Sequence, residues 1–237
     1  MSEPVVREEV SSPFDRVSPS AKLFVCLSVA FISCLLLGDV IGGKNIGTPL
    51  GPISVGIVAF PVTFLLTDVV NDFYGRRGAR FLTFLGFGAA VGAWVLLQIT
   101  TAIPPPPDPN DTYFTQAEFI KIFGGSARLF VASIIAYLIG QFLDIYVFQF
   151  WKALTQSRHL WLRATGSTLL SQIVDTVAVN GIFWFGKQDA AWIARKGLRE
   201  YGIKLVVAIC LTPVIYALHG AIVRWMKLEP EKHETRT

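Results

Sequence analysis

The stretch Phe81–Ile103, FLTFLGFGAAVGAWVLLQITTAI, contains no charged residue. A bilayer core of roughly 30 Å is crossed by a helix of about 20 apolar residues, so this stretch is long enough to span a membrane. Hydrophobic residues make up 52% of the 237-residue chain. Charged residues make up only 16% of it, whereas an average soluble protein has roughly 25%. The sequence therefore predicts a membrane protein.

Five further apolar stretches lie before and after this one, and the charged residues cluster between them. We expect an all-α membrane protein, a bundle of six transmembrane helices that forms a single transport domain over residues 21–226. Polar tails are expected at 1–20 and 227–237. The predicted spans are 22–42, 51–73, 81–103, 129–150, 164–186 and 205–224.

Lys and Arg are distributed unevenly over the predicted loops. With the N-terminus inside, the inner segments carry 13 of them and the outer segments carry 8. Cytoplasmic loops are enriched in Lys and Arg, so we expect a multi-pass protein of the inner membrane with both termini in the cytoplasm. The outer loop 187–204 opposes this bias with five basic residues. Residues 189–199 of this loop are expected to form a short interfacial helix.

Several classes of function are disfavoured by what the sequence contains. The net charge of +4 does not indicate nucleic-acid binding, because the basic residues flank the spans, where anionic lipid attracts them. No metal or cofactor is expected, since Cys26, Cys34 and Cys210 have no His or carboxylate at ligand spacing. The sequence has no Gly-rich nucleophile turn and no HExxH pattern, so an enzyme is not expected. It also has no phosphate-binding loop, so ATP energy would require a separate ATPase partner.

Among the acidic residues inside predicted spans, Asp68, Asp144 and Asp175 stand out because each has polar neighbours at helical spacing. A charged side chain inside a span costs about 2.5–3.5 kcal/mol on insertion scales, so each is a functional candidate. Polar residues accompany each acid at intervals of three and four, and residues so spaced share one helix face. They are Asn71 and Asp72 after Asp68, Tyr137 and Gln141 before Asp144, and Thr168 and Gln172 before Asp175.

These polar stripes are expected at a common depth. At 1.5 Å rise per residue, Asp68, Gln141, Asp144, Gln172 and Asp175 lie roughly 10–18 Å from the inner boundary. We therefore expect one polar pocket near the midplane, where transporters bind their cargo. Carboxylates and amides suit a planar heterocycle with adjacent N–H donors, such as a purine-like base.

Two other interpretations of the acids remain open: they hold helices together, or they form a proton or cation path. No Lys or Arg is expected at the depth of these acids, and this disfavours a role in holding the helices together. Lys204 is expected at the outer boundary, where its long stem reaches the interface. His219 is expected to pack near the inner end of the last span rather than to relay protons.

Long, ordered motifs over about residues 21–224 resemble those of the queuosine precursor transporters, also known as vitamin uptake transporters. The first is PVTFLLTD at Pro61–Asp68, followed by Tyr74, Gly75 and Arg80. The second runs from Arg128 to Asp144 and includes Ser133, Tyr137, Gly140 and Gln141. The match continues through Gln156–Arg158, Ser167–Leu169, Asp175, Thr176, Lys204, Pro213 and Tyr216.

The resemblance implies a six-helix importer whose fold is similar to the substrate-binding subunits of energy-coupling-factor transporters. The implied cargo is a 7-deazaguanine, such as 7-cyano-7-deazaguanine or its aminomethyl relative. The resemblance carries over Asp68, Gln141, Asp144, Thr168 and Asp175 as binding residues. Asn71 and Gln172 are added from their spacing, and Tyr137 as a stacking face.

Alternatives to a self-sufficient importer stay open. One is a substrate-binding subunit of an ATP-driven vitamin or nucleobase transporter. Another is a proton-coupled or cation-coupled carrier of a different small heterocycle. A homo-oligomer and an energising ATPase partner are both compatible with the sequence.

Overall fold

The computed structural model describes residues 17–42, 44–48, 51–108, 113–123, 127–156 and 159–230. The helices are α1 (Pro19–Ile41), α2 (Phe60–Phe73), α3 (Gly75–Ala102), α4 (Gln116–Phe123), α5 (Ala127–Leu154), α6 (Leu160–Trp184) and α7 (Ala190–Met226). Between α1 and α2 lie the strands β1 (Asn45–Thr48) and β2 (Gly51–Ser54), which pair antiparallel, and the 3-10 helix η1 (Val55–Val58). Most of the two predicted polar tails lies outside the described residues.

Local sequence explains several helix boundaries. Ser18 precedes α1 and accepts a hydrogen bond from the Ala21 amide, which is the usual role of an N-cap serine. Asp189 caps α7 in the same way through the amide of Trp192. Between α2 and α3 the chain turns at Gly75, whose φ of 64° favours glycine because it has no Cβ.

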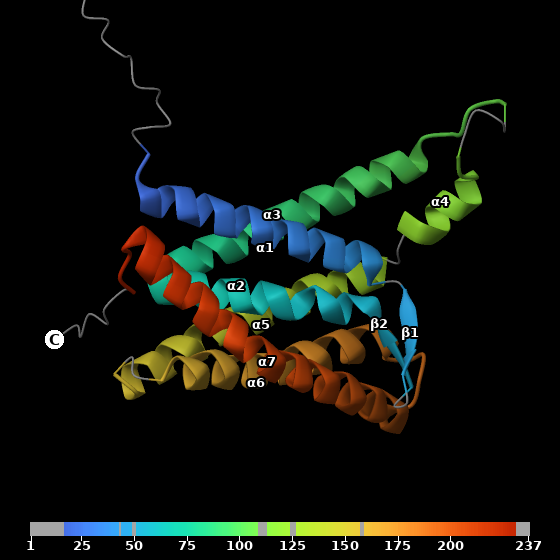
Figure 1. Cartoon of the computed structure of the whole chain (residues 1–237). Helices are drawn as coiled ribbons and strands as arrows, with labels where there is room; N and C mark the ends of the chain where they lie inside the picture. Colours follow the sequence, from blue (N-terminus) through green and yellow to red (C-terminus); the bar gives the residue numbers. More distant parts are fainter. Residues whose placement is uncertain are drawn as a thin grey trace, which may run out of the picture.

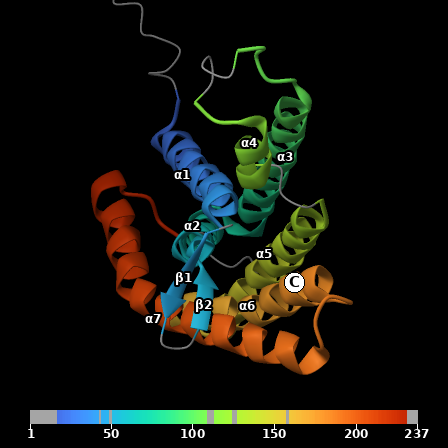
Figure 2. The ribbon, with the colours of Figure 1, turned by 90° about the vertical axis from the view of Figure 1, so that its right-hand side faces the viewer.

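The long helices lie roughly along one axis, and the β1–β2 hairpin and α4 lie at one end of the bundle (Figure 1). Figure 2 shows α2 in the middle, with α1 and α3 on one side of it and α6 and α7 on the other. The central place of α2 explains why its buried share is the highest among the apolar helices.

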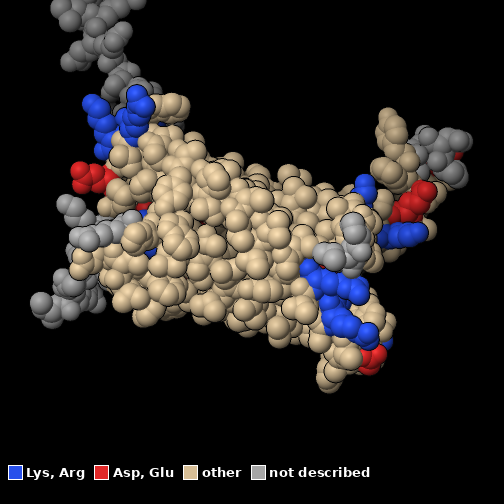
Figure 3. Space-filling model, turned by 60° about the horizontal axis from the view of Figure 1, so that its bottom comes forward, with Lys and Arg blue, Asp and Glu red and all other residues tan. Residues whose placement is uncertain are grey.

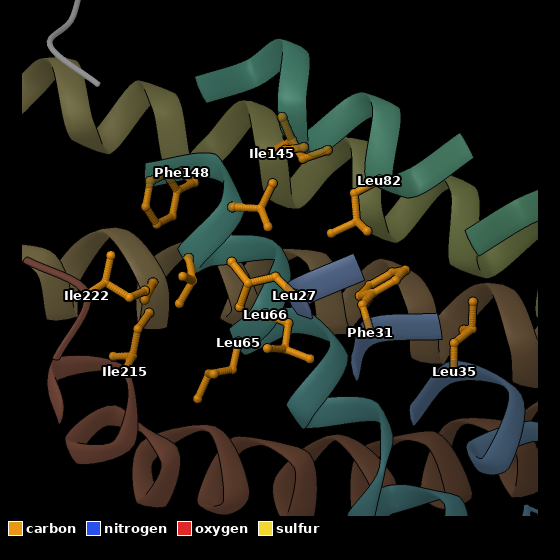
Figure 4. Close-up of a cluster of buried hydrophobic side chains, with 14 of the residues drawn as sticks. Leu27, Phe31, Leu35, Leu65, Leu66, Leu82, Ile145, Phe148, Ile215 and Ile222 are labelled. Atoms are coloured by element: carbon orange, nitrogen blue, oxygen red, sulfur yellow. The ribbon is translucent and has the colours of Figure 1, made fainter. Parts of the chain in front are cut away.

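A hydrophobic core fills the space around α2, and α1, α2, α3, α5, α6 and α7 all contribute to it (Figure 4). Gly86 of α3 lets the helices approach closely here. A Cβ on this residue would lie 2.5 Å from the hydroxyl of Tyr137 and 2.7 Å from the ring of Phe31. The core side chains labelled in Figure 4 are Leu27, Phe31, Leu35, Leu65, Leu66, Leu82, Ile145, Phe148, Ile215 and Ile222.

Among the residues that the structure describes, five helical segments are long and apolar enough to cross a membrane. They are Pro19–Ile41, Val55–Phe73, Gly75–Ala102, Phe130–Leu154 and Ala190–Met226. On the face shown in Figure 3, Lys, Arg, Asp and Glu gather at the two ends of the molecule, with a broad band free of them between. This distribution is typical of a protein that spans a bilayer.

The structure changes three details of the predicted spans. Helix α6 takes the place of the span 164–186 but is not among the five apolar helices, so a count of six spans stays a prediction. Residues 51–54 form strand β2 instead of the start of a helix. The separate interfacial helix at 189–199 is wrong, because these residues run on without interruption into the rest of α7.

Candidate functional site

Two of the predicted acids meet where α2, α5 and α6 pack together. Asp68 is 2% exposed and Asp144 is 0% exposed, and their carboxyl groups lie close enough for their charges to interact. The Ser167 hydroxyl donates to Oδ1 of Asp68 at 3.4 Å, and the Ser171 hydroxyl donates to Oδ1 of Asp144 at 3.1 Å. Because the two serines are one helical turn apart on α6, they hold both carboxyl groups against the same face.

Gln141 and Gln172 are also buried on α5 and α6, and we call the whole group the polar seam: Asp68, Gln141, Asp144, Ser167, Ser171 and Gln172. Four of its atoms have no hydrogen-bond partner among the described residues. They are both amide atoms of Gln141, Oδ2 of Asp144 and Oε1 of Gln172. A buried polar group without a partner costs roughly 1–3 kcal/mol, so such groups in a native protein call for an explanation such as a ligand.

A cavity of about 30 Å³ lies beside Asp68 and Thr168, between α2, α6 and α7. A space of this size holds about one water molecule, whereas ligand pockets are roughly 300 Å³ or larger. The remaining lining residues are Pro61, Leu65, Ala164, Thr165, Ala208, Leu211, Thr212 and Ile215. Apart from Thr165 on α6 and Thr212 on α7, these side chains are apolar. The hydroxyl groups of these two threonines hydrogen-bond to each other across the space.

A third buried acid, Asp72, lies one turn after Asp68 and contacts three basic residues. Lys152 Nζ and Arg163 Nη1 lie 2.9 and 3.1 Å from its Oδ1, and His219 Nδ1 lies 3.1 Å from its Oδ2. We call these four residues the Asp72 cluster. Lys152 also donates to the Asp72 carbonyl at 2.8 Å, so the cluster joins α2 to α5, α6 and α7.

The Asp72 cluster changes how two basic residues are interpreted. Lys152 and Arg163 count as inner-loop charges in the sequence, yet each is only 2% exposed. Helices α5 and α6 extend beyond the predicted spans and carry both residues into the bundle. His219 contacts Asp72 and lies against Phe73, with ring centroids 5.1 Å apart.

Two predicted site residues bond to neighbouring helices instead of facing the polar seam. The Asn71 amide donates to the Ile145 carbonyl at 3.2 Å, and its Oδ1 accepts from Gln149 at 2.6 Å. The Tyr137 hydroxyl donates to the Thr83 carbonyl of α3 at 2.9 Å. Thr168 lines the cavity beside Asp68.

Asp175 has a cation partner. Its Oδ2 lies 2.6 Å from Nζ of Lys204, which also donates to the Thr176 hydroxyl at 3.3 Å. The expectation that no Lys or Arg shares the depth of the acids is therefore wrong, and so is the placement of Lys204 at the outer boundary. Because α7 is continuous, Lys204 lies within the helix and alongside α6. A Cβ on Gly140 of α5 would lie 3.5 Å from the Cβ of Asp175, so this acid lies beside the turn that carries Gln141.

Sequence reasoning missed Ser167, Ser171 and Arg163, although a signal for them exists. These three residues follow one another at intervals of four on α6, so they form a single stripe that faces α2 and α5. On α5, Lys152 lies eight residues after Asp144 and extends its stripe in the same way.

Comparisons with known proteins agree with the family resemblance of the sequence motifs. Residues 54–218 match a family model described as "Putative vitamin uptake transporter". The chain is 30% identical over 165 residues to the "Probable queuosine precursor transporter" of Bacillus subtilis (strain 168), which covers 69% of this chain and 70% of that protein. It is 29% identical over 167 residues to the "Queuosine precursor transporter" of Escherichia coli (strain K12), with 69% and 71% covered.

A third relative is the "Probable queuosine precursor transporter" of Haemophilus influenzae (strain ATCC 51907 / DSM 11121 / KW20 / Rd), 28% identical over 167 residues, with 69% of this chain and 66% of that protein covered. No solved structure matches the chain significantly, so the likeness to energy-coupling-factor subunits stays a prediction. The family model spans most of the chain and includes all or most of four of the five apolar helices found in the described residues, Pro19–Ile41 being the exception. The chain therefore belongs to the vitamin uptake transporter family and is a multi-pass membrane protein of that family.

Proposed function

We propose that the chain imports a queuosine precursor, either 7-cyano-7-deazaguanine or 7-aminomethyl-7-deazaguanine, across the inner membrane. The observation that carries this proposal is the set of unpartnered polar atoms on Gln141, Asp144 and Gln172 in the buried polar seam. The names of the relatives support the cargo class. Both termini are proposed to be cytoplasmic, in line with the bias of the basic residues.

The chemistry of a guanine-like edge suits these atoms. Such an edge presents a ring N–H and an amino group side by side, and a carbonyl next to them. The Asp144 carboxylate accepts both N–H donors, and the Gln141 amide both donates and accepts. Hydrogen bonds to a charged acceptor are roughly twice as strong as neutral ones, so Asp144 supplies the largest single contribution to recognition.

The other predicted residues take supporting roles in this proposal. Thr168 and Asp68 line the cavity, and we assign them contacts with the base. Asn71 and Tyr137 fix α5 against α2 and α3 through the bonds described above. Asp175 is neutralised by Lys204 and orients the neighbouring turn of α5 around Gly140.

Binding of a base requires the helices around the polar seam to separate, because a space of about 30 Å³ is too small for it. The Asp72 cluster ties α6 and α7 to α2 at one end of the bundle. Helices α6 and α7 are linked to each other by the Asp175–Lys204 pair. We therefore propose that α6 and α7 move together away from α2, with the Asp72 cluster as the fixed end.

The test is uptake of labelled 7-cyano-7-deazaguanine and 7-aminomethyl-7-deazaguanine by cells that express this chain alone and lack their own importer and precursor synthesis. We expect accumulation with the wild type and a strong loss with Asp144→Asn at equal amounts of protein in the membrane. The exposed acid Asp39 provides the matched control, and Asp39→Asn should retain uptake. Accumulation no greater than in cells without the chain would contradict the proposal, and uptake restored only by an added ATPase subunit would favour the binding-subunit alternative.

A further inference from the structure

Asp68 and Asp144 lie side by side, fully buried, with one hydroxyl donor each. We propose that this pair holds a single proton, carried by Asp68, and that the proton crosses the membrane together with the base. The coupling step rests on the proposed function, whereas the shared proton is a property of the chain itself. The unpartnered amide of Gln141, on the same face of α5 as Asp144, marks this place as built for a ligand.

The basic residues near the pair are engaged by other groups. Lys152 of α5, Arg163 of α6 and His219 of α7 surround Asp72 on α2. Lys204 of α7 binds Asp175 of α6. On the remaining helices, Asp39 of α1 accepts from Ser133, and Arg80 of α3 contacts the hydroxyl of Tyr146. Within the described part of the chain, no ion pair reaches Asp68 or Asp144. In this proposal a bound proton therefore removes one of the two negative charges.

Two carboxyl groups that share a buried site do not both ionise, because each raises the cost of charging the other. Asp68 is the member that keeps the proton. The hydroxyl bond to Asp68 is the longer one, 3.4 Å against 3.1 Å at Asp144, so Asp144 is the better stabilised anion.

One proton makes the pair complementary to the base. Protonated Asp68 donates its O–H to the carbonyl of the base, and ionised Asp144 accepts the adjacent N–H donors. With both acids ionised, the carbonyl would face a second acceptor, and with both protonated, the N–H donors would lose their charged acceptor. The proton binds Asp68 from water on the entry side and returns to water on the exit side when the base leaves, so no bond in the base is formed or broken.

Infrared spectroscopy of the purified protein tests the proton directly and needs no base. We expect the carbonyl band of a buried protonated carboxyl group in the wild type, lost in Asp68→Asn and retained in Asp39→Asn. The Asn side chain has nearly the shape of the acid, so thermal unfolding should confirm that the variant is folded. Absence of the band in the folded wild type, or its persistence in folded Asp68→Asn, would overturn the shared proton.

Uptake by the protein reconstituted in lipid vesicles tests the coupling. We expect an alkaline interior to increase accumulation of labelled 7-cyano-7-deazaguanine at least several-fold in the wild type. In Asp68→Asn the amide remains a donor, so binding of the base should change by only a few-fold while the stimulation disappears. Stimulation by a sodium gradient instead of a pH gradient, or unchanged stimulation in Asp68→Asn, would overturn the coupling. If the protein takes up no base at all, the proposed function is contradicted. The infrared result would still show whether Asp68 and Asp144 share a proton.

Discussion

Asp72 and Asp144 are equally buried, at 1% and 0% exposure, but their surroundings differ completely. Asp72 meets a lysine, an arginine and a histidine from three other helices. Asp144 receives one serine hydroxyl and keeps an oxygen without a partner among the residues that the structure places. Burial of an acid in a membrane protein therefore does not by itself identify a binding residue. We infer the binding role of Asp144 from the balance between its charge and its partners.

In the proposed function, the two regions also divide the work of a transporter between them. The Asp72 cluster joins four helices and gives the bundle a fixed end. In the polar seam, two serine hydroxyls of α6 reach the acids of α2 and α5, and we propose that the helices separate there. Each substitution below alters the Asp72 cluster, the polar seam or the ion pair between Asp175 and Lys204.

The largest effect is expected for Asp72→Ala. Removing one member of a buried ion cluster leaves Lys152 and Arg163 charged without their counter-ion, which typically costs about 3–5 kcal/mol. We expect a large fall in the thermal unfolding temperature and in the amount of folded protein in the membrane. Asp39→Ala removes an exposed acid and serves as the control. A folded Asp72→Ala protein as stable as this control would show that the Asp72 cluster is not the fixed end.

A smaller change of opposite sign is expected for Gln141→Met. The substitution removes two buried amide atoms that have no partner in the described structure and leaves a side chain of similar length. Because an unmade buried hydrogen bond costs roughly 1–3 kcal/mol, the free protein should become more stable by about 1 kcal/mol. Binding of the base should weaken in the same variant. A loss of stability would mean that Gln141 serves the fold instead of the cargo.

The smallest effect is expected for Lys204→Met, which breaks the ion pair with Asp175. Both side chains are partly exposed, at 15% and 18%, so the stability change should be on the order of 1 kcal/mol. A double-mutant cycle with Asp175→Asn isolates the pair, since residues in contact show a coupling energy that distant ones lack. A coupling energy of several kcal/mol would contradict this expectation and would show that the pair stabilises the fold as strongly as the Asp72 cluster.

Much of the fold could be predicted, because apolar length alone locates a membrane helix. The helices coincide with the predicted spans to within a few residues at many of their ends, and the polar stripes on α2, α5 and α6 do meet at Asp68 and Asp144. Periodicity gives the face of a helix that each residue occupies. It does not say which neighbouring helix covers that face, and for this reason the contacts of Asn71 with Gln149 and Ile145 were not foreseen.

The pairing of Asp175 with Lys204 could not be predicted for a different reason. Residues 187–204 carry enough charge to suggest a loop, so Lys204 was expected outside the bundle. The Asp189 cap starts a helix at Ala190 that runs past Lys204, and this continuity places the lysine beside α6. Lys152 and Arg163 were missed similarly, because their buried counter-ion lies on a distant part of the chain.

The most direct test of the central claim is equilibrium binding of labelled 7-cyano-7-deazaguanine to the purified wild type, to Asp144→Asn and to the Asp39→Asn control. Asn at position 144 replaces a charged acceptor with an amide whose donor faces the donors of the base. Loss of a charged hydrogen bond is worth roughly 1.5–3 kcal/mol, which corresponds to about ten- to hundredfold weaker binding. We expect that loss in Asp144→Asn at unchanged yield of folded protein, and wild-type affinity in the control. Wild-type affinity in folded Asp144→Asn would contradict the role of the polar seam in recognising the base.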